Sequence, residues 1–373
     1  FFITINVKIQ EVKMISQYPH LIDLNDYPVS WWNKIIELGH DIKNHPQRYT
    51  HACDGKIMAT LFYEPSTRTQ MSFQSAMIRL GGSIIGFDNP ATSSVSKGES
   101  LKDTTKIVSN YADILIIRHP LPGAAKAAAL TADCSVVNAG DGGHLHPTQT
   151  LTDLLTLKEE KGRLDNLNVG LCGDLVNGRT VHSLCKALSA YSGNTFVLIS
   201  TPQLRLPSYI KDIIIASGSK FTEVTSLDEV INDLDMLYMT RIQQERFASE
   251  EEYLAEKDTY ILDRKKLKKS RSDMIIMHPM PRVDEIADEV DDDKRAVYFK
   301  QAKYGMYVRM ALIMTMLENQ KPIKLIKGIE RPQCLCTNPK CITNTEHYLP
   351  KSYLGTGDTI ECEYCDERIL LTH

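Results

Sequence analysis

The segment Ser66-Thr67-Arg68-Thr69 has the composition of an anion-binding site. It follows an apolar run that ends near Phe62 and precedes a helical pattern that continues through Leu80, so it is expected at the start of a helix. Backbone N–H groups and the positive end of the helix dipole favour a phosphate there, hydroxyls can donate to it, and Arg68 can bind its oxygens. An ordinary Ser/Thr helix cap with a surface arginine is the alternative, and the segment alone does not decide between the two.

Polar clusters recur at similar places farther along the chain. Each lies just after a predicted strand or at a predicted helix start, and ligands of open α/β sheets bind beyond the carboxyl ends of the strands. A single arginine is usually a solvated charge and a single histidine usually a structural group, so only the recurrence predicts a site. The clusters are Arg118-His119-Pro120, His146-Pro147-Thr148-Gln149, Arg179, and Arg241-Ile242-Gln243.

Two further loops contain groups that could contact a ligand. The segment His278-Pro279-Met280-Pro281-Arg282 has two prolines, and because proline has no N–H, nearby carbonyls stay available to accept from a ligand amide. The segment Ser93-Ser94-Val95-Ser96-Lys97-Gly98-Glu99 is rich in serine and has no strong helical pattern. Its spacing alone indicates a solvated surface loop.

The last forty residues contain five of the nine cysteines. Cys336 and Cys341 are separated by four residues, and Cys362 and Cys365 by two, which is typical of a four-cysteine zinc ribbon. Four thiolates close the coordination sphere, so the predicted role of Zn²⁺ is structural, and metal binding would supply folding free energy that a short tail lacks. Disulfides are the alternative, which a reducing compartment disfavours. The spare ligand candidates are Cys334 and His347.

Apolar, β-rich runs alternate with helical stretches, which predicts an α/β fold of two domains, each with a parallel sheet flanked by helices. Eight candidate strands suggest two sheets of about four. A helix at about 148–158, with Gly162 as its stop signal, joins the two halves, and a last helix is expected at about 304–317. The candidate strands span 56–62, 82–87, 114–118, 135–138, 168–172, 195–200, 236–239 and 273–277.

Length and composition agree with this organisation. The 373 residues are too many for one ordinary core, and the formal net charge of -4 gives no basic excess for nucleic acid. No apolar run of about 18 residues suits a membrane span and no signal-peptide pattern is present, which favours a cytoplasmic location. The cysteines outside the tail stand among apolar or small neighbours and are expected to be reduced and buried. They are Cys53, Cys134, Cys172 and Cys185.

From about His20 to Glu318 the sequence resembles the catalytic chain of aspartate carbamoyltransferase, and the last forty residues resemble the zinc domain of that enzyme's regulatory chain. The two are fused here. Gln70 and Met280 depart from the residues that the family often has, but neither removes a named contact. The motifs that carry the resemblance are Ser-Thr-Arg-Thr at 66–69, Lys-Gly-Glu at 97–99, Arg-His-Pro at 118–120, His-Pro-Thr-Gln-Thr at 146–150, Gly-Arg-Thr-Val at 178–181, Met-Thr-Arg-Ile-Gln at 239–243 and His-Pro-Met-Pro-Arg at 278–282.

The resemblance implies transfer of the carbamoyl group of carbamoyl phosphate to the amino group of L-aspartate, the committed step of pyrimidine synthesis. Positive charge placed in advance would stabilise the developing oxyanion and the departing phosphate, without a covalent nucleophile. The implied phosphate ligands are Ser66, Thr67, Arg68, Thr69 and Arg118. The groups that polarise the carbonyl are Thr69, Arg118 and His146. The carbamoyl NH2 is held by Gln149 and the carbonyls around Pro279 and Met280. The aspartate ligands are Lys97, Arg179, Arg241 and Gln243.

In this family a serine and a lysine of a mobile loop act on the site of a neighbouring subunit. The corresponding residues are Ser93 and Lys97, with Ser94 and Ser96 as alternatives for the serine. The family's serine lies four positions before its lysine, which favours Ser93. The resemblance therefore replaces the surface-loop interpretation and implies a homotrimer or a multiple of trimers.

The resemblance also assigns the domains. A carbamoyl-phosphate-binding domain is expected at 19–150, with the last helix packed back on it, and an aspartate-binding domain at 151–303. A connector at 319–331 leads to the zinc-binding module at 332–373, and residues 1–18 are expected to be an extension outside the fold. The connector is too short for the nucleotide-binding domain of the regulatory chain, so no ATP or CTP control is expected from this chain alone. Docking to another chain through the zinc module stays open.

Two alternatives remain. Ornithine carbamoyltransferase shares the phosphate-binding half, but the extra carboxylate of aspartate needs extra cationic partners, which Arg179 and Arg241 supply. A scaffold protein whose zinc module recruits a partner is the other alternative. The full set of cationic residues disfavours it.

Overall fold

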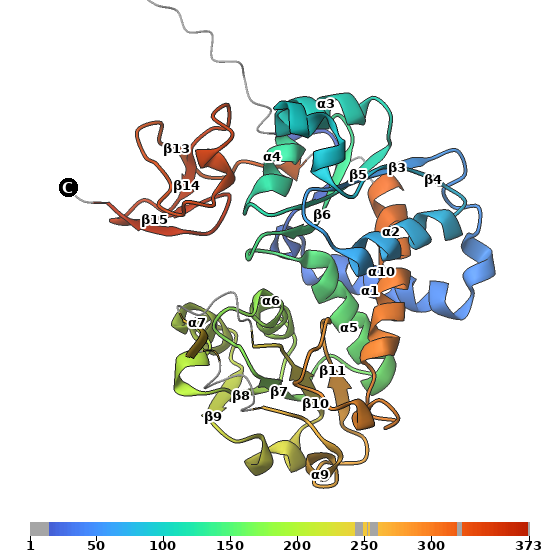
Figure 1. Ribbon diagram of the computed structural model, residues 1–373, viewed down its shortest axis with the longest axis vertical. Coiled ribbons are helices and arrows are strands. Elements are labelled where there is room, and N and C mark those ends of the chain that lie inside the picture. Colours follow the sequence, from blue (N-terminus) through green and yellow to red (C-terminus); the bar gives the residue numbers. More distant parts are fainter. Residues whose placement is uncertain (1–14, 243–248, 252, 254–259, 319–322, 372–373) are drawn as a thin grey trace, which may run out of the picture. The chain divides into compact units, whose positions relative to one another are not determined.

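The computed structural model describes residues 15–242, 249–251, 253, 260–318 and 323–371. The chain forms two compact units. The first consists of Phe1–Ile22, His51–His144 and Ile313–His373, and the second of Asp23–Thr50 and Leu145–Leu312. Each unit contains a parallel sheet with helices beside it (Figure 1), which confirms the predicted α/β class.

The first unit is built on a five-stranded parallel sheet in the order β2-β6-β5-β3-β4. Strand β6 is buried at every position and β3 at five of six, as expected for a parallel sheet covered on both faces. The strands are β2 (His20–Leu21), β3 (Ile57–Phe62), β4 (Ser83–Phe87), β5 (Ile114–His119) and β6 (Ser135–Asp141), and the helices are α2 (Thr67–Arg79), α3 (Leu101–Ser109) and α4 (Ala124–Thr131).

The second unit has its own five-stranded parallel sheet in the order β11-β10-β7-β8-β9. Helix α5 ends at Gly162, which has a φ of +73°, as the sequence predicts. The strands are β7 (Asn168–Cys172), β8 (Thr195–Ile199), β9 (Lys220–Val224), β10 (Met236–Met239) and β11 (Ile275–Met277), and the helices are α1 (Val29–Asn44), α5 (Pro147–Lys161), α6 (Arg179–Leu188), α7 (Ser208–Ala216), α9 (Arg264–Leu267) and α10 (Tyr298–Glu318). The last six residues of α10, from Ile313, belong to the first unit.

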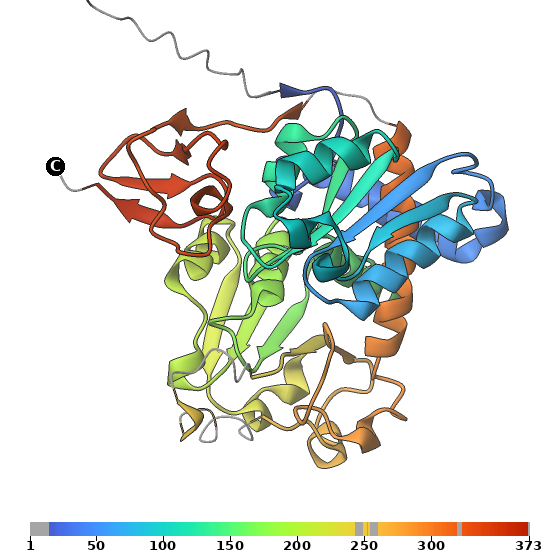
Figure 2. The same cartoon turned by 45° about the horizontal axis from the view of Figure 1, so that its top comes forward.

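The C-terminal module, residues 329–371, belongs to the first unit and is red in Figure 2. Its buried side chains join those of α4 and β5 in one hydrophobic cluster. Close packing depends on Gly123, where a Cβ would lie 2.6 Å from the Cβ of Tyr364. The module contains an antiparallel sheet of β13 (Ile329–Glu330), β14 (Ser352–Leu354), β15 (Thr359–Cys362) and β16 (Arg368–Leu370), and a separate pair joins β1 (Ile15–Ser16) to β12 (Ile323–Lys324).

Two sequence predictions about the elements are wrong. Both parallel sheets have five strands rather than about four. Strand β2 is only two residues long, and the edge strand β9 is partly exposed and has three polar residues among its five, so neither has a buried-strand signal. The last helix begins at Tyr298 rather than near Tyr304, because its first turns bury the polar Gln301, which interrupts the apolar pattern.

Among the residues described, no helix is both long and apolar enough to cross a bilayer.

Candidate active site and metal site

The first polar segment lies where α2 begins. Ser66 occupies the N-cap position, but its side chain forms no capping hydrogen bond. The first N–H groups of a helix have no partner within the helix. The ordinary-cap alternative for Ser66 therefore loses its main support, and the geometry suits an anion at this helix start.

Arg118 is brought beside this segment by strand pairing. Phe62 of β3 is the register partner of Arg118 in β5, and the N–H of Tyr63 donates to the carbonyl of Arg118 over 2.8 Å. The guanidinium of Arg118 lies 2.9 Å from a carboxylate oxygen of Glu64, and its Nη1 donates to the carbonyl of Ala139 over 3.2 Å. Its Nε is buried and has no hydrogen-bond partner among the described residues. At least one N–H of Arg118 therefore has no partner among the described residues.

Arg68 and Arg118 form an electropositive region at the carboxyl ends of β3 and β5. Burial lowers the pKa of Arg68, and the nearby charge of Arg118 lowers it further. Burial also lowers the pKa of Arg118, although Glu64 opposes that shift. Both guanidinium groups stay charged at neutral pH. Among the described residues, Glu64 forms an ion pair with Arg118 and Asp141 also favours its charge, whereas Arg68 has no ion pair, so an anion would still be attracted here.

The loop that contains Ser93 and Lys97 has a structure of its own within the first unit. The Ser93 hydroxyl donates to the carbonyl of Pro90 over 2.8 Å and accepts from the N–H of Val95 over 3.3 Å. Lys97 is exposed at the end of a short 3-10 helix, Ser94–Lys97. The hydrogen bonds and ion pairs described for this chain do not join either residue to Arg68. Their predicted action on a neighbouring subunit stays a prediction.

The second unit carries the other predicted groups at the carboxyl ends of neighbouring strands. Strand β10 pairs in parallel with both β7 and β11. The segments that follow these three strands therefore begin at the same end of the sheet, where the carboxyl ends of the strands lie. Arg179 begins α6 after β7, and Arg241 follows β10. Pro279 and Met280 follow β11. Gln243 lies outside the described residues.

Helix α5 carries two more of the predicted groups. His146 is the N-cap residue of α5 and is 6% exposed. Gln149, in the first turn, donates through Nε2 to Oδ1 of Asp153 over 2.8 Å. Both side chains are therefore fixed at the start of this helix.

The loop after β11 is held by several side-chain bonds. The N–H of Met280 donates to Nδ1 of His278 over 2.7 Å, and Nε2 of His278 lies 2.7 Å from Oε1 of Glu285. Met280 has a φ of +54°, which is uncommon for a residue other than glycine. The side chain of Arg282 pairs with Asp291. The carbonyls of this loop therefore have defined directions.

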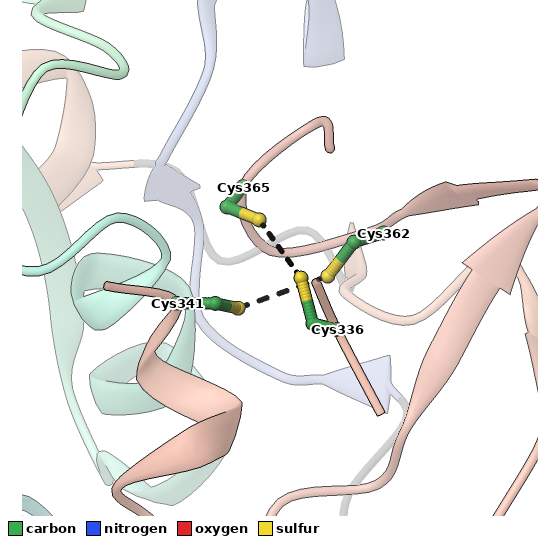
Figure 3. Close-up of side chains that lie close together, drawn as sticks. All are labelled: Cys336, Cys341, Cys362 and Cys365. Atoms are coloured by element: carbon green, nitrogen blue, oxygen red, sulfur yellow. Dashed lines mark hydrogen bonds between the residues drawn. The ribbon is translucent and has the colours of Figure 1, made fainter. Parts of the chain in front are cut away.

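The four cysteines predicted as metal ligands lie together in the module. All four Sγ atoms fall within 4.8 Å of one another and are buried (Figure 3). Cys336 and Cys365 are 3.5 Å apart and Cys341 and Cys362 are 3.8 Å apart, measured between their Sγ atoms. A disulfide would need about 2 Å, whereas four thiolates at about 2.3 Å from one tetrahedral ion would lie about 3.8 Å apart. The donor set therefore fits a metal ion, and the spare candidates Cys334 and His347 are not part of it.

The module is anchored to the first unit by polar contacts as well. Lys126 pairs with Glu363 over 2.9 Å, and the N–H of Ile342 donates to the carbonyl of Pro122 over 3.0 Å. The two residues Ile342 and Glu363 each adjoin a cysteine of the cluster.

A histidine forms a third contact with the module. His144 lies between Asp141 and Asp366, with 3.0 Å from a ring nitrogen to each carboxylate. Although burial alone would lower it, the two carboxylates raise the pKa of His144 to about 10. Asp366 follows Cys365 directly, so the ion pair joins a cysteine turn to the loop after β6.

Several of these contacts were not predicted. Glu64, His144, Asp153 and Gln301 each orient a predicted group or its loop. Only Asp153 has a sequence signal, since a carboxylate amid the leucines of 151–157 must find donors when that helix is buried. The others meet their partners through tertiary structure.

Three known protein-family domains match successive parts of the chain. Residues 19–159 match the carbamoyl-phosphate-binding domain of aspartate/ornithine carbamoyltransferase, and residues 165–316 match its Asp/Orn binding domain. Residues 325–371 match the metal-binding domain of the aspartate carbamoyltransferase regulatory chain.

Among individual relatives, the aspartate carbamoyltransferase catalytic subunit of Clostridium perfringens strain SM101 is 58% identical over 299 residues, which are 80% of this chain and 97% of that protein. The corresponding subunit of Clostridium kluyveri strain ATCC 8527 is 55% identical over 298 residues, again 80% and 97%.

Solved structures give the same result. The catalytic subunit of M. jannaschii aspartate transcarbamoylase has a TM-score of 0.75 at 45% identity, covering 80% of this chain and 98% of that one. The Trypanosoma cruzi aspartate transcarbamoylase in complex with carbamoyl phosphate and aspartate has a TM-score of 0.74 at 36% identity, covering 79% and 94%. The resemblance inferred from the motifs is thereby confirmed: the chain belongs to the aspartate carbamoyltransferase family, as a catalytic chain that continues into a metal-binding domain of the regulatory-chain type.

Proposed function

We propose that this protein transfers the carbamoyl group from carbamoyl phosphate to the amino group of L-aspartate, giving N-carbamoyl-L-aspartate and phosphate, the committed step of pyrimidine synthesis. The arginine pair Arg68 and Arg118 is the observation that carries the proposal, because an arginine donor without a partner beside a helix start suits a phosphate. Family membership supports aspartate as the acceptor.

Residues 19–150 would form the carbamoyl-phosphate-binding domain. Arg68 and Arg118 would bind phosphate oxygens as the bond between the carbamoyl carbon and the bridging oxygen breaks. The charge on the departing phosphate increases in this step, so fixed cations stabilise the transition state more than the ground state. Further ligands from the same segment are Ser66, Thr67 and Thr69.

The carbonyl and amino ends of the carbamoyl group need different partners. As the aspartate nitrogen attacks, the carbonyl oxygen gains negative charge, which Thr69, Arg118 and His146 would stabilise. The carbamoyl NH2 is a donor, so Gln149 and the carbonyls of Pro279 and Met280 would accept from it. The amine loses a proton in the same sequence of steps, and no side chain becomes covalently attached.

Residues 151–303 would form the aspartate-binding domain. Its arginines Arg179 and Arg241, with Gln243, would bind the two carboxylates of aspartate. Lys97 and Ser93 would come from a neighbouring subunit, which requires a homotrimer or a multiple of it. Lys97 is exposed, and among the described residues no hydrogen bond or ion pair joins Lys97 or Ser93 to the arginine pair, which supports this arrangement.

The cysteine cluster is proposed to hold structural Zn²⁺. Four thiolates suit zinc better than harder cations, and a closed tetrahedron leaves no open position for a substrate. None of the nine cysteines forms a disulfide in the structure, which fits a reducing compartment such as the cytoplasm. The exposed surface of the module remains available for docking to another chain.

The experiment is phosphate release measured with carbamoyl phosphate and L-aspartate, L-ornithine or no acceptor. Release that requires aspartate supports the proposal. Release that requires ornithine would assign the other transferase activity, and no release above the background rate with either acceptor would favour a scaffold.

A further inference from the structure

Asp153 lies in the middle of α5 and is completely buried. Three donors surround its carboxylate. Nε2 of Gln149 and Nε2 of Gln301 both donate to Oδ1, over 2.8 and 2.7 Å, and the hydroxyl of Tyr238 donates to Oδ2 over 2.9 Å. The mechanism proposed above gives this carboxylate no contact with a substrate.

The carboxylate decides which end of the Gln149 amide faces away from it. Oδ1 of Asp153 accepts from both glutamines, and the ionised carboxylate only accepts hydrogen bonds, so the NH2 end of Gln149 points toward Asp153. The carbonyl oxygen Oε1 of Gln149 then points away from Asp153 and can accept a hydrogen bond from another group. An acceptor is what recognition of a ligand NH2 requires.

The second glutamine connects the same carboxylate to the loop after β11. Gln301 donates to Asp153 with Nε2 and accepts the N–H of His278 with Oε1 over 3.0 Å. His278 is the residue before Pro279, and its ring accepts the N–H of Met280. Asp153 therefore orients Gln149 directly and the carbonyl-bearing loop through Gln301.

We propose that Asp153 is a positioning residue for amide recognition: it turns Gln149 and the loop from His278 to Met280 so that their acceptors select an NH2 group on the phosphate substrate. The inference rests on the proposed function, which assigns these acceptors to the carbamoyl NH2. It makes Asp153 responsible for discrimination between carbamoyl phosphate and its methyl analogue acetyl phosphate.

The surrounding charges determine the choice of variants. Burial raises the pKa of Asp153 to about 7, while its three donors and Arg309 oppose that shift. Arg309 is itself buried, and its Nη2 donates to Thr148 over 3.4 Å. Both Asp153→Asn and Asp153→Leu remove the negative charge beside Arg309, so a comparison of the two isolates the hydrogen-bond acceptor.

Asparagine at position 153 preserves the hydrogen bonds that orient Gln149 and Gln301. Its Oδ1 can still accept from both glutamines, and its Nδ2 can donate to the Tyr238 oxygen, since a phenol can accept as well as donate. Leucine has a similar shape but no acceptor, so Gln149 and Gln301 lose the group that orients them.

The readout is a ratio, the inhibition constant of acetyl phosphate divided by the KM for carbamoyl phosphate. Loss of one well-placed hydrogen bond to the NH2 should lower this ratio about tenfold in Asp153→Leu. The ratio in Asp153→Asn should stay within about twofold of the unaltered protein. A general loss of stability would change both constants together and leave the ratio unchanged.

Circular dichroism checks that each variant folds, and Asp153→Ala, which lacks the acceptor and is smaller, replaces the leucine variant if that one does not. Gln149→Ala tests the underlying assignment separately. If Gln149→Ala lowers the ratio and the variants without an acceptor at 153 do not, the positioning role is overturned. If Gln149→Ala keeps the ratio, the role of Gln149 in the proposed function is overturned, and the inference with it.

Discussion

Replacing Arg68 by alanine should remove activity while leaving the fold intact. Arg68 is exposed in the first turn of α2 and has no ion pair with another described residue. Substitutions at such positions change the free energy of unfolding by less than about 0.5 kcal/mol. The charge-assisted contact with the departing phosphate is expected to contribute about 3 kcal/mol to the transition state, so the rate should fall roughly a hundredfold.

The assay is the initial rate of phosphate release at saturating aspartate, with a thermal unfolding curve for the same preparation. Arg79→Ala is the matched control, because Arg79 is also exposed and lies in the last turn of the same helix. It should retain activity within about twofold. A loss below about threefold for Arg68→Ala would refute the phosphate-binding role, and a large fall in its unfolding temperature would refute the view of Arg68 as structurally dispensable.

Three further predictions concern assembly, metal and pH. Mixing Lys97→Ala chains with Arg68→Ala chains should restore part of the activity, because exchanged trimers contain some intact shared sites; no recovery would contradict sharing. A strong chelator should remove zinc, measured by elemental analysis, and lower the unfolding temperature, and added zinc should restore it; an unchanged temperature after zinc loss would contradict a structural role. Protonated His144 stabilises the fold through its ion pairs. Its contribution to the free energy of unfolding should therefore be complete below about pH 6.5 and disappear as the pH rises through about 10. Urea midpoints across that range should fall less steeply in His144→Gln, and parallel curves would contradict the ion pairs with Asp141 and Asp366.

Local patterns explain what the sequence could predict. The segment 66–69 is predicted at a helix start because the preceding strand and the following helix are both visible in the apolar pattern. The cysteine spacing similarly specifies its cluster without knowledge of the rest of the chain. Motif, element and site coincide in these cases because the relevant contacts are close in sequence.

Contacts between distant segments could not be predicted in this way. Asp366 can pair with His144 only when the C-terminal module is packed on α4. Nothing in the periodicity of either segment encodes that pair. The sequence of helix α4 does indicate that another element packs on it, because its run of alanines gives a flat surface that can be approached closely.

The hydrogen-bond network around Asp153 could be predicted only in part from the sequence. Gln149 was predicted from a motif, but the direction of its amide depends on a carboxylate one helical turn later. That spacing of four residues is visible in the sequence. The contribution of Gln301 from α10 is not visible, because it requires the packing of two helices.

Formation of the new bond between the carbamoyl carbon and the aspartate nitrogen is the most direct test of the proposed reaction. Carbamoyl phosphate labelled with ¹³C and aspartate labelled with ¹⁵N would be incubated with the protein and followed by NMR. The proposed transfer predicts a product carbon signal split by one-bond coupling to ¹⁵N, appearing in step with free phosphate. Release of phosphate without that coupling would mean hydrolysis rather than transfer, and would contradict the proposed function.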